Sequence, residues 1–220
     1  MMEAKGAFIQ ALQRDEHFSP FLRTFENDKQ QEVRLPGKDN GLDVEGLLVR
    51  ENRVFLGLRG PVLRGYACML ELAVHSKQHG GGLELRPLIV DAESEETRLY
   101  RKHFVRLEGL GIRDLEEVSG DLLILAGPTA DVHGPEQVFR WNAWLTDLPD
   151  HDSISELKFD SPQWPLVLQS NFKVGHPEAI ALSPTSTPGV RQLVVIRDSP
   201  QDVVPGDEFA AVGELASLPV

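Results

Sequence analysis

The sequence predicts an all-β fold of antiparallel blades, and three observations support this prediction. A pattern of two adjacent apolar runs recurs three times in 220 residues, with copies that begin near Val44, Ile112 and Pro177, roughly 66 residues apart. Each copy is typical of β-hairpins, because its short apolar runs are separated by turn-forming residues. Helix-like patterns are scarce after residue 25. Radial repetition of such hairpins is characteristic of a β-propeller.

The N-terminal segment, residues 1–35, differs in pattern and is predicted to be a helical plug. Apolar residues at helical spacing predict a helix over residues 4–14. We expect the aromatic residues that follow, among them Phe18 and Phe21, to pack on the larger domain. Residues 26–42 are polar and rich in turn formers, which predicts a loop. The propeller-like domain is placed at residues 36–220.

Three blade repeats are predicted within this domain, at residues 43–107, 109–172 and 174–220. The equivalent first strands of the three repeats are expected at Val44–Val49, Ile112–Val118 and Glu178–Leu182. The other predicted strands are Val54–Leu58, Tyr66–Val74, Leu83–Val90, Tyr100–Leu107, Leu122–Ala126, Val138–Leu145, Trp164–Phe172, Gln192–Arg197 and one in the tail Phe209–Leu218. Polar loops are predicted at residues 91–96, 146–162 and 183–189.

The number of repeats has a consequence for assembly. Propellers need about four to eight blades to close, and three repeats of this length occupy the whole sequence. The sequence therefore predicts an incomplete propeller with two open edges. Because unpaired strand edges recruit partners, we expect either a homodimer through these edges or an arc whose edges are capped by the terminal segments.

Composition narrows the classes of partner. The formal charge is −12, from 34 acidic and 22 basic residues, and an acidic surface repels a phosphate backbone, which argues against nucleic-acid binding. The apolar stretch near the N-terminus is short and soon interrupted by charges, so we expect no membrane span and a cytoplasmic protein. The single cysteine, Cys68, lies in an alternating apolar run and is predicted to be a small buried hydrophobe.

Candidate ligand-binding residues lie at the starts of first strands and the ends of second strands. These positions share one face of a blade, because two antiparallel strands reverse the chain twice. The candidates are Glu45, Arg59, Arg113, Asp114, Asp131, His133, Glu178 and Arg197. Mixed arginines and carboxylates can orient an anion or hold a divalent cation such as Ca²⁺. The alternative is that Arg–carboxylate pairs only tie neighbouring blades together.

The dipeptide Lys102-His103 is a further candidate, within the predicted strand Tyr100–Leu107. In an alternating strand one of the two side chains faces the core and the other faces out. His103 is then either a general acid or base, or a hydrogen-bonded structural histidine. The sequence contains no nucleophile elbow, phosphate-binding loop, dinucleotide fingerprint or His-Glu-x-x-His motif.

Several strings of residues together resemble a bacterial family of unknown function over roughly residues 10–200. They are Asp43–Leu47, Phe55–Gly65, Tyr100–Phe104, Gly111–Leu115 and Leu125–Thr129, in that order. The family is similar, more distantly, to propellers of the esterase-like phytase type. The resemblance implies a propeller fold and a cytoplasmic protein, and it implies no activity. Family members generally carry further blade-forming sequence before the region covered here, and the calcium ligands of phytases have no residue-by-residue match.

Two classes of function stay open at this point. The first is a hydrolase acting on phosphoesters or esters, or a binder of a small anionic ligand, at the channel mouth. The second is a non-catalytic scaffold that binds a protein partner. Propellers serve both classes, so the fold alone does not decide between them.

Overall fold

The computed structural model describes residues 3–26, 28–34, 39–77, 82–130, 134–158, 164–168, 175–185, 190–198 and 212–219. These residues are mostly β-strand, with short helices α1 (Glu3–Arg14), α2 (Ser19–Leu22) and α3 (Trp144–Asp147). Nearly all strand pairs are antiparallel, and the exception is the parallel pair of β13 (Ser153–Ser155) with β9 (Arg101–Arg106). The predicted all-β, antiparallel character is therefore confirmed, as is the N-terminal helix.

Each of the three larger sheets begins with antiparallel strands in chain order. The first sheet contains β3 (Asp43–Arg50), β4 (Arg53–Gly60), β5 (Tyr66–Ser76) and β9, with β6 (Leu83–Arg86) paired to β5 and β13 at the far edge. The second sheet contains β10 (Gly111–Val118), β11 (Asp121–Gly127), β12 (Glu136–Trp141) and β14 (Leu166–Leu168). The third sheet contains β15 (His176–Pro184), β16 (Val190–Asp198) and β17 (Val212–Pro219). Two small hairpins are β1 (Thr24–Glu26) with β2 (Glu32–Arg34), and β7 (Leu88–Asp91) with β8 (Glu96–Arg98).

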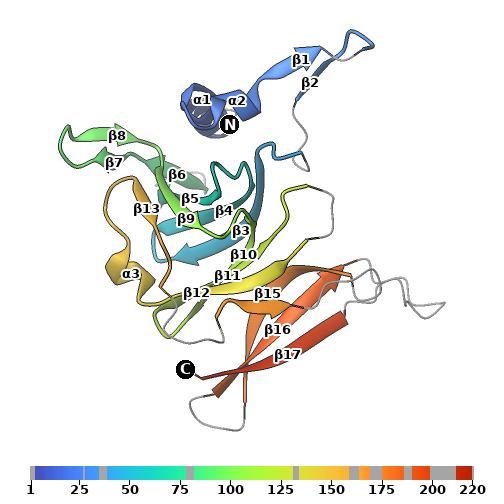
Figure 1. Cartoon of the computed structure of the whole chain (residues 1–220). Helices are drawn as coiled ribbons and strands as arrows, with labels where there is room; N and C mark the ends of the chain where they lie inside the picture. The colour runs from blue at the N-terminus through green and yellow to red at the C-terminus, as the bar shows by residue number, and fades with distance from the viewer. Residues whose placement is uncertain are drawn as a thin grey trace.

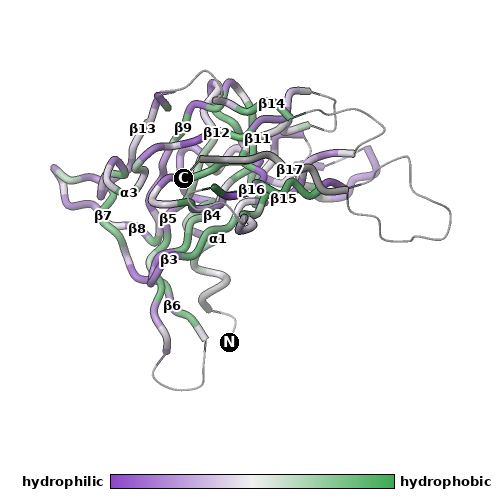
Figure 2. Tube along the Cα trace, turned by 90° about the horizontal axis from the view of Figure 1, so that it is seen from below, coloured by the Kyte–Doolittle hydropathy of each residue, from purple (hydrophilic) through white to green (hydrophobic). Residues whose placement is uncertain are grey.

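The three sheets follow one another in space, with the N-terminal helices at one end and the third sheet at the other (Figure 1). One apolar cluster, which includes Phe55, Ile112 and Trp144, joins the first sheet to the second. Another, which includes Leu125 and Ile180, joins the second sheet to the third. Apolar segments accordingly run through the central strands, whereas the turn between β7 and β8 is hydrophilic (Figure 2).

The N-terminal segment covers the outer face of the first sheet. Leu12 and Phe18 are buried there in a cluster that includes Leu70 of β5 and Tyr100, which directly precedes β9. Cys68 belongs to the same cluster and is fully buried, as predicted. Burial raises the pKa of its thiol far above the usual range, which makes this cysteine unreactive.

Each of the three sheets begins with the same irregularity. The pairing of β3 with β4, of β10 with β11 and of β15 with β16 shifts register near the start of the first strand, and the β3–β4 pair has a second shift that skips Arg59 of β4. The first-strand residue left without a Cα partner is Glu45, Arg113 or Glu178. A bulge adds one residue to one strand and re-aims its side chain. The bulged residue of each first strand is the one that the sequence repeat aligns.

Glycine is required where the first and second sheets approach most closely. A Cβ on Gly57 would lie 2.3 Å from Cγ2 of Ile112, and one on Gly111 would lie 1.9 Å from the carbonyl oxygen of Arg59. Neither distance is possible without movement of the strands. The absence of a side chain at both positions therefore sets the spacing between β4 and β10.

Some predicted boundaries are wrong. The strand predicted over Leu83–Val90 is two strands, β6 and β7, because Pro87 has no N–H with which to continue a ladder. The loop predicted at 91–96 is the turn of the β7–β8 hairpin, and the regions predicted as loops at 26–42 and 146–162 contain β2 and β13. The strand predicted over Val138–Leu145 ends at Trp141, after which the chain enters α3.

Candidate functional site

Four of the predicted site residues meet at the bulges, and we call them the bulge charge cluster: Glu45, Arg59, Arg113 and Glu178. The Arg59 Nη1 atom donates to Glu45 Oε1 at 2.5 Å within the first sheet. Nη1 of Arg113, on the second sheet, donates to Glu178 Oε1 of the third sheet at 2.5 Å and lies 4.0 Å from Glu45 Oε2. A line of alternating charge therefore crosses all three sheets.

The two arginine side chains of this cluster are almost fully buried, at 8% exposed for Arg59 and 7% for Arg113. Gly127 makes room for Arg113, because a Cβ there would lie 2.6 Å from the arginine Nε. Burial raises the pKa of Glu45, although the neighbouring guanidinium groups of Arg59 and Arg113 lower it in part. Such burial is costly unless each charge is paired, and here each arginine has a carboxylate at hydrogen-bond distance.

The remaining predicted site residues are placed differently. Asp114 accepts hydrogen bonds from the backbone N–H groups of Leu115 and Ile180, so it links the second and third sheets without joining the cluster. Burial raises the pKa of Asp114. The Arg197 Nη1 atom donates to the carbonyl oxygen of Gly175 at 3.2 Å. Asp131 and His133 lie outside the described residues.

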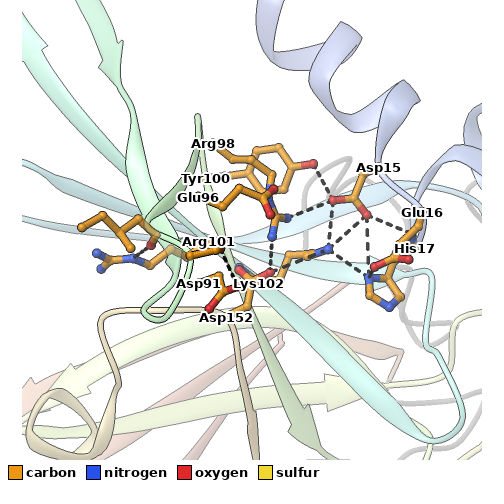
Figure 3. A network of polar contacts seen from close by, with 12 residues as sticks. Asp15, Glu16, His17, Asp91, Glu96, Arg98, Tyr100, Arg101, Lys102 and Asp152 are labelled. Atoms are coloured by element: carbon orange, nitrogen blue, oxygen red, sulfur yellow. Dashed lines mark hydrogen bonds and ion pairs between the residues drawn. The ribbon is translucent and has the colours of Figure 1, made fainter.

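A second polar network, between the N-terminal segment and the first sheet, was not foreseen from the sequence. Lys102 Nζ lies 3.0 Å from Asp15 Oδ2, and the two side chains are only 4% and 3% exposed. Asp15 also accepts from the hydroxyl of Tyr100 at 2.9 Å and lies 3.3 Å from Nη1 of Arg98 (Figure 3). Asp152 completes the network, accepting from Arg98 Nη2 at 2.6 Å.

The prediction that one of Lys102 and His103 faces out is wrong, because both faces of β9 are covered. The N-terminal segment buries Lys102 on one face, whereas His103 is fully buried on the other. The ring of His103 bonds Glu71 Oε2 at 3.0 Å and Ser153 Oγ at 2.8 Å. These contacts fit the interpretation of His103 as a hydrogen-bonded structural histidine.

Glu71, the carboxylate beside His103, is fully buried as well. It accepts from Arg53 Nη1 at 2.6 Å and lies 3.3 Å from Arg101 Nη1. Burial alone would raise the pKa of Glu71, but the hydrogen bond and charge of His103, with the two arginines, lower it below the usual value. Sequence spacing gives no sign of this group, because its members come from four separate strands.

Within the described parts of the chain, no three His, Cys, Asp or Glu side chains are grouped so as to hold a metal ion. No helix in those parts is long and apolar enough to cross a lipid bilayer. What the geometry does provide is an ionic link across three sheets and a buried polar network beneath the N-terminal helices.

The fold and the cluster define a class of protein, namely a mostly β protein of several antiparallel sheets, three of which are joined by charged residues at their bulges. Over residues 1–209 the chain matches the family described as "Protein of unknown function (DUF3616)", and it belongs to that family. This agrees with the expectation of a family of unknown function. Comparison with curated proteins and with solved structures gives no significant match.

Proposed function

We propose that the chain forms an arc of a β-propeller in which the three sheets are successive blades. Each sheet begins with its bulged strand, followed by antiparallel neighbours in chain order, and β10 lies against both β3 and β15. Consecutive packing of first strands supports a common axis, and the bulge charge cluster would lie beside that axis. Arg113 supports the arrangement further, because it faces a carboxylate from the sheet on either side.

Within this proposal, the arc is a non-catalytic interaction module that assembles with a second copy of the chain. The observation that carries it is a difference in burial between three equivalent residues. Each lies two residues after the bulge residue of its first strand. Leu115 of the second sheet and Ile180 of the third are 3% and 4% exposed, whereas Leu47 of the first sheet is 56% exposed. Val49, two residues further along β3, is 61% exposed. The first sheet packs against β10 and the second packs against β15, but the described residues contain no preceding sheet that packs against β3.

The third sheet offers the complementary face. Leu123 and Leu125 of β11 pack in the same cluster as Ile180. The bulge registers place Val194 and Ile196 at the equivalent positions of β16, and Ile196 is 41% exposed. A head-to-tail contact of β3 in one copy with β16 in the other would repeat packing already present twice within the chain. Two arcs would give about six blades, within the range of closed propellers.

Molecular mass in solution tests this assembly. Light scattering is expected to give about twice the chain mass of 24.5 kDa. Leu47→Lys and Ile196→Lys should each yield monomers, because a lysine head cannot be buried without a partner. Val167→Lys is the matched control, since Val167 is 65% exposed on β14 and belongs to neither face. It should leave the dimer intact.

The contact is head-to-tail, so mixing the two monomeric variants is informative. A mixed dimer of Leu47→Lys and Ile196→Lys chains keeps one unaltered contact and should regain part of the dimer signal. A contact between like faces would not be restored by mixing. A wild-type chain that stays monomeric at high concentration would overturn the proposed assembly, as would a Leu47→Lys chain that still forms dimers.

Binding of a small anion at the bulge charge cluster, with or without hydrolysis of a phosphoester or ester, is the second candidate function. Nε of Arg59 and Nε of Arg113 favour it, because both are buried without a hydrogen-bond partner within the part of the chain described. The balance of charges in the cluster favours the alternative, in which the arginine–carboxylate pairs only link the sheets. Three carboxylates, those of Asp43, Glu45 and Glu178, lie near two guanidinium groups.

Inorganic phosphate separates these two interpretations. If the cluster binds anions, phosphate should raise the melting temperature of the wild type, and Arg113→Gln should abolish that rise. Arg50→Gln is the matched control, because Arg50 pairs with Glu117 at 2.9 Å between the same two sheets but at the other end of β3. Turnover of p-nitrophenyl phosphate and acetate, with and without Ca²⁺, tests hydrolysis. No response to phosphate and no turnover would leave only the inter-sheet link.

A further inference from the structure

A cavity lies beside the N-terminal segment, and no residue of the bulge charge cluster or of the two faces of the proposed assembly lines it. Its volume is about 730 Å³, within the usual range for small-molecule sites. Residues from four separate parts of the chain line it, and those that matter here are His17, Phe21, Val62, Leu63, Arg64 and Phe104. The wall is mostly apolar, with one imidazole and one guanidinium group.

The buried network of Figure 3 holds His17 in one tautomer. Lys102 Nζ lies 2.9 Å from His17 Nδ1. An ammonium group can only donate, so Nδ1 is the acceptor and the ring proton is on Nε2. The Asp15 carboxylate in turn holds Lys102 at 3.0 Å, with both side chains buried. Nε2–H of His17 is therefore a fixed donor, and it has no hydrogen-bond partner within the described residues.

Aromatic rings on one side of the cavity pack against His17 and the N-terminal segment. The rings of His17 and Phe104 pack edge to face, with centroids 5.2 Å apart. Phe21 comes from α2, which the N-terminal segment holds against the sheet through buried Leu22. Such walls suit a flat aromatic ring, because aromatic groups prefer edge-to-face and offset contacts.

Arg64 supplies the positive charge of the cavity wall. It lies in a tight turn closed by backbone hydrogen bonds between Leu63 and Tyr66, at 2.9 and 3.0 Å. Its φ of 53° and the φ of 89° at Gly65 are both in the left-handed region, which fixes the direction of the turn. Within the described residues the guanidinium group has no ion-pair partner, although the chain has a net charge of −12. Among the described residues that line the cavity, Glu16 is the acidic one, and its side chain is 82% exposed.

We propose that this cavity binds a small aromatic carboxylate. The ring would lie between the Phe21–Phe104 side and the Val62–Leu63 side, and the carboxylate would face Arg64 and Nε2–H of His17. An arginine fork matches a carboxylate through two parallel hydrogen bonds. A single guanidinium and one neutral donor suit a monoanion better than a phosphate dianion, which calls for more positive charge.

Titration with 1-naphthoate tests the proposal, and the uncharged 1-naphthalenemethanol is the matched compound. The wild type is expected to bind the carboxylate at least roughly 10-fold more tightly than the alcohol, because charge-assisted hydrogen bonds are the stronger ones. Arg64→Gln should remove this preference. Arg86→Gln, an exposed arginine on β6 outside the cavity, should preserve it.

A second measurement places the ligand. In the spectrum of protein with ¹⁵N-labelled histidine, His17 is expected to show the Nε2–H tautomer, and naphthoate should shift its Nε2 resonance. His17→Gln assigns the signal, and circular dichroism verifies that each variant is folded. Equal binding of the alcohol, unchanged binding by Arg64→Gln, or a His17 signal that naphthoate does not move would each overturn the proposal. None of these outcomes depends on whether the chain dimerises, since the cavity contains neither Leu47 nor Ile196.

Discussion

Replacing Asp15 by asparagine is expected to lower the free energy of unfolding by about 3–5 kcal/mol at neutral pH. The substitution leaves the Lys102 ammonium buried without the carboxylate that now lies 3.0 Å away. It also weakens the acceptor for the Tyr100 hydroxyl and for Arg98. Urea unfolding followed by tryptophan fluorescence measures the loss.

The loss should depend on pH in a defined direction. Burial alone would raise the pKa of Asp15, but the hydrogen bond and charge of Lys102 outweigh burial, and the pKa lies below its ordinary value. A carboxylate with a depressed pKa in the folded state contributes stability above its unfolded pKa of about 3.9 and loses it as pH falls through the folded value. The difference between wild type and Asp15→Asn should therefore be complete above about pH 5 and shrink below about pH 4.

Asp150→Asn is the control for this substitution, because its side chain is 84% exposed. It should change the free energy of unfolding by no more than about 0.5 kcal/mol. An Asp15→Asn protein as stable as the wild type, or a difference that stays constant down to about pH 2, would contradict the assignment of Asp15 and Lys102 as a buried ion pair.

The second large effect is expected at the closest approach of the first two sheets. Gly57→Ala should lower the free energy of unfolding by about 1–3 kcal/mol, because the added methyl would overlap Ile112. Ile112→Ala alone should cost about 2–5 kcal/mol through the cavity it leaves. In the double variant the methyl of residue 57 occupies part of that cavity, so the combined loss should fall short of the sum by about 0.5–3 kcal/mol.

Gly6→Ala is the control for an added methyl. Gly6 lies within α1, where a Cβ would meet nothing closer than Gln10 Nε2 at 3.8 Å. Alanine is the better helix former, so this variant should be unchanged or more stable by up to about 1 kcal/mol. Additive losses at positions 57 and 112 would mean that the two residues are not in contact, and the packing of β4 against β10 would have to be revised.

The repeat was accessible from sequence because it is a local pattern. Glu45, Arg113 and Glu178 could be aligned by their neighbours alone, and the strand pairing places all three at a register shift. The direction of chain reversal then predicts that strand starts and ends share one face. The same reasoning correctly places Arg59 beside Glu45. Arg197 is aligned in the same way, and its guanidinium group donates to the carbonyl oxygen of Gly175.

The sequence by itself determined the β character, the three equivalent first strands, the helical N-terminus and the burial of Cys68. Each of these depends on the spacing of apolar residues over a few positions, which the covalent chain carries directly. The tertiary structure decided which charges are paired. Arg113 meets Glu178 across 65 positions, and Lys102 meets Asp15 across 87. In both pairs the packed strands and helices exclude water, so each buried charge needs a partner. The faces that exclude the water come together only when the chain folds.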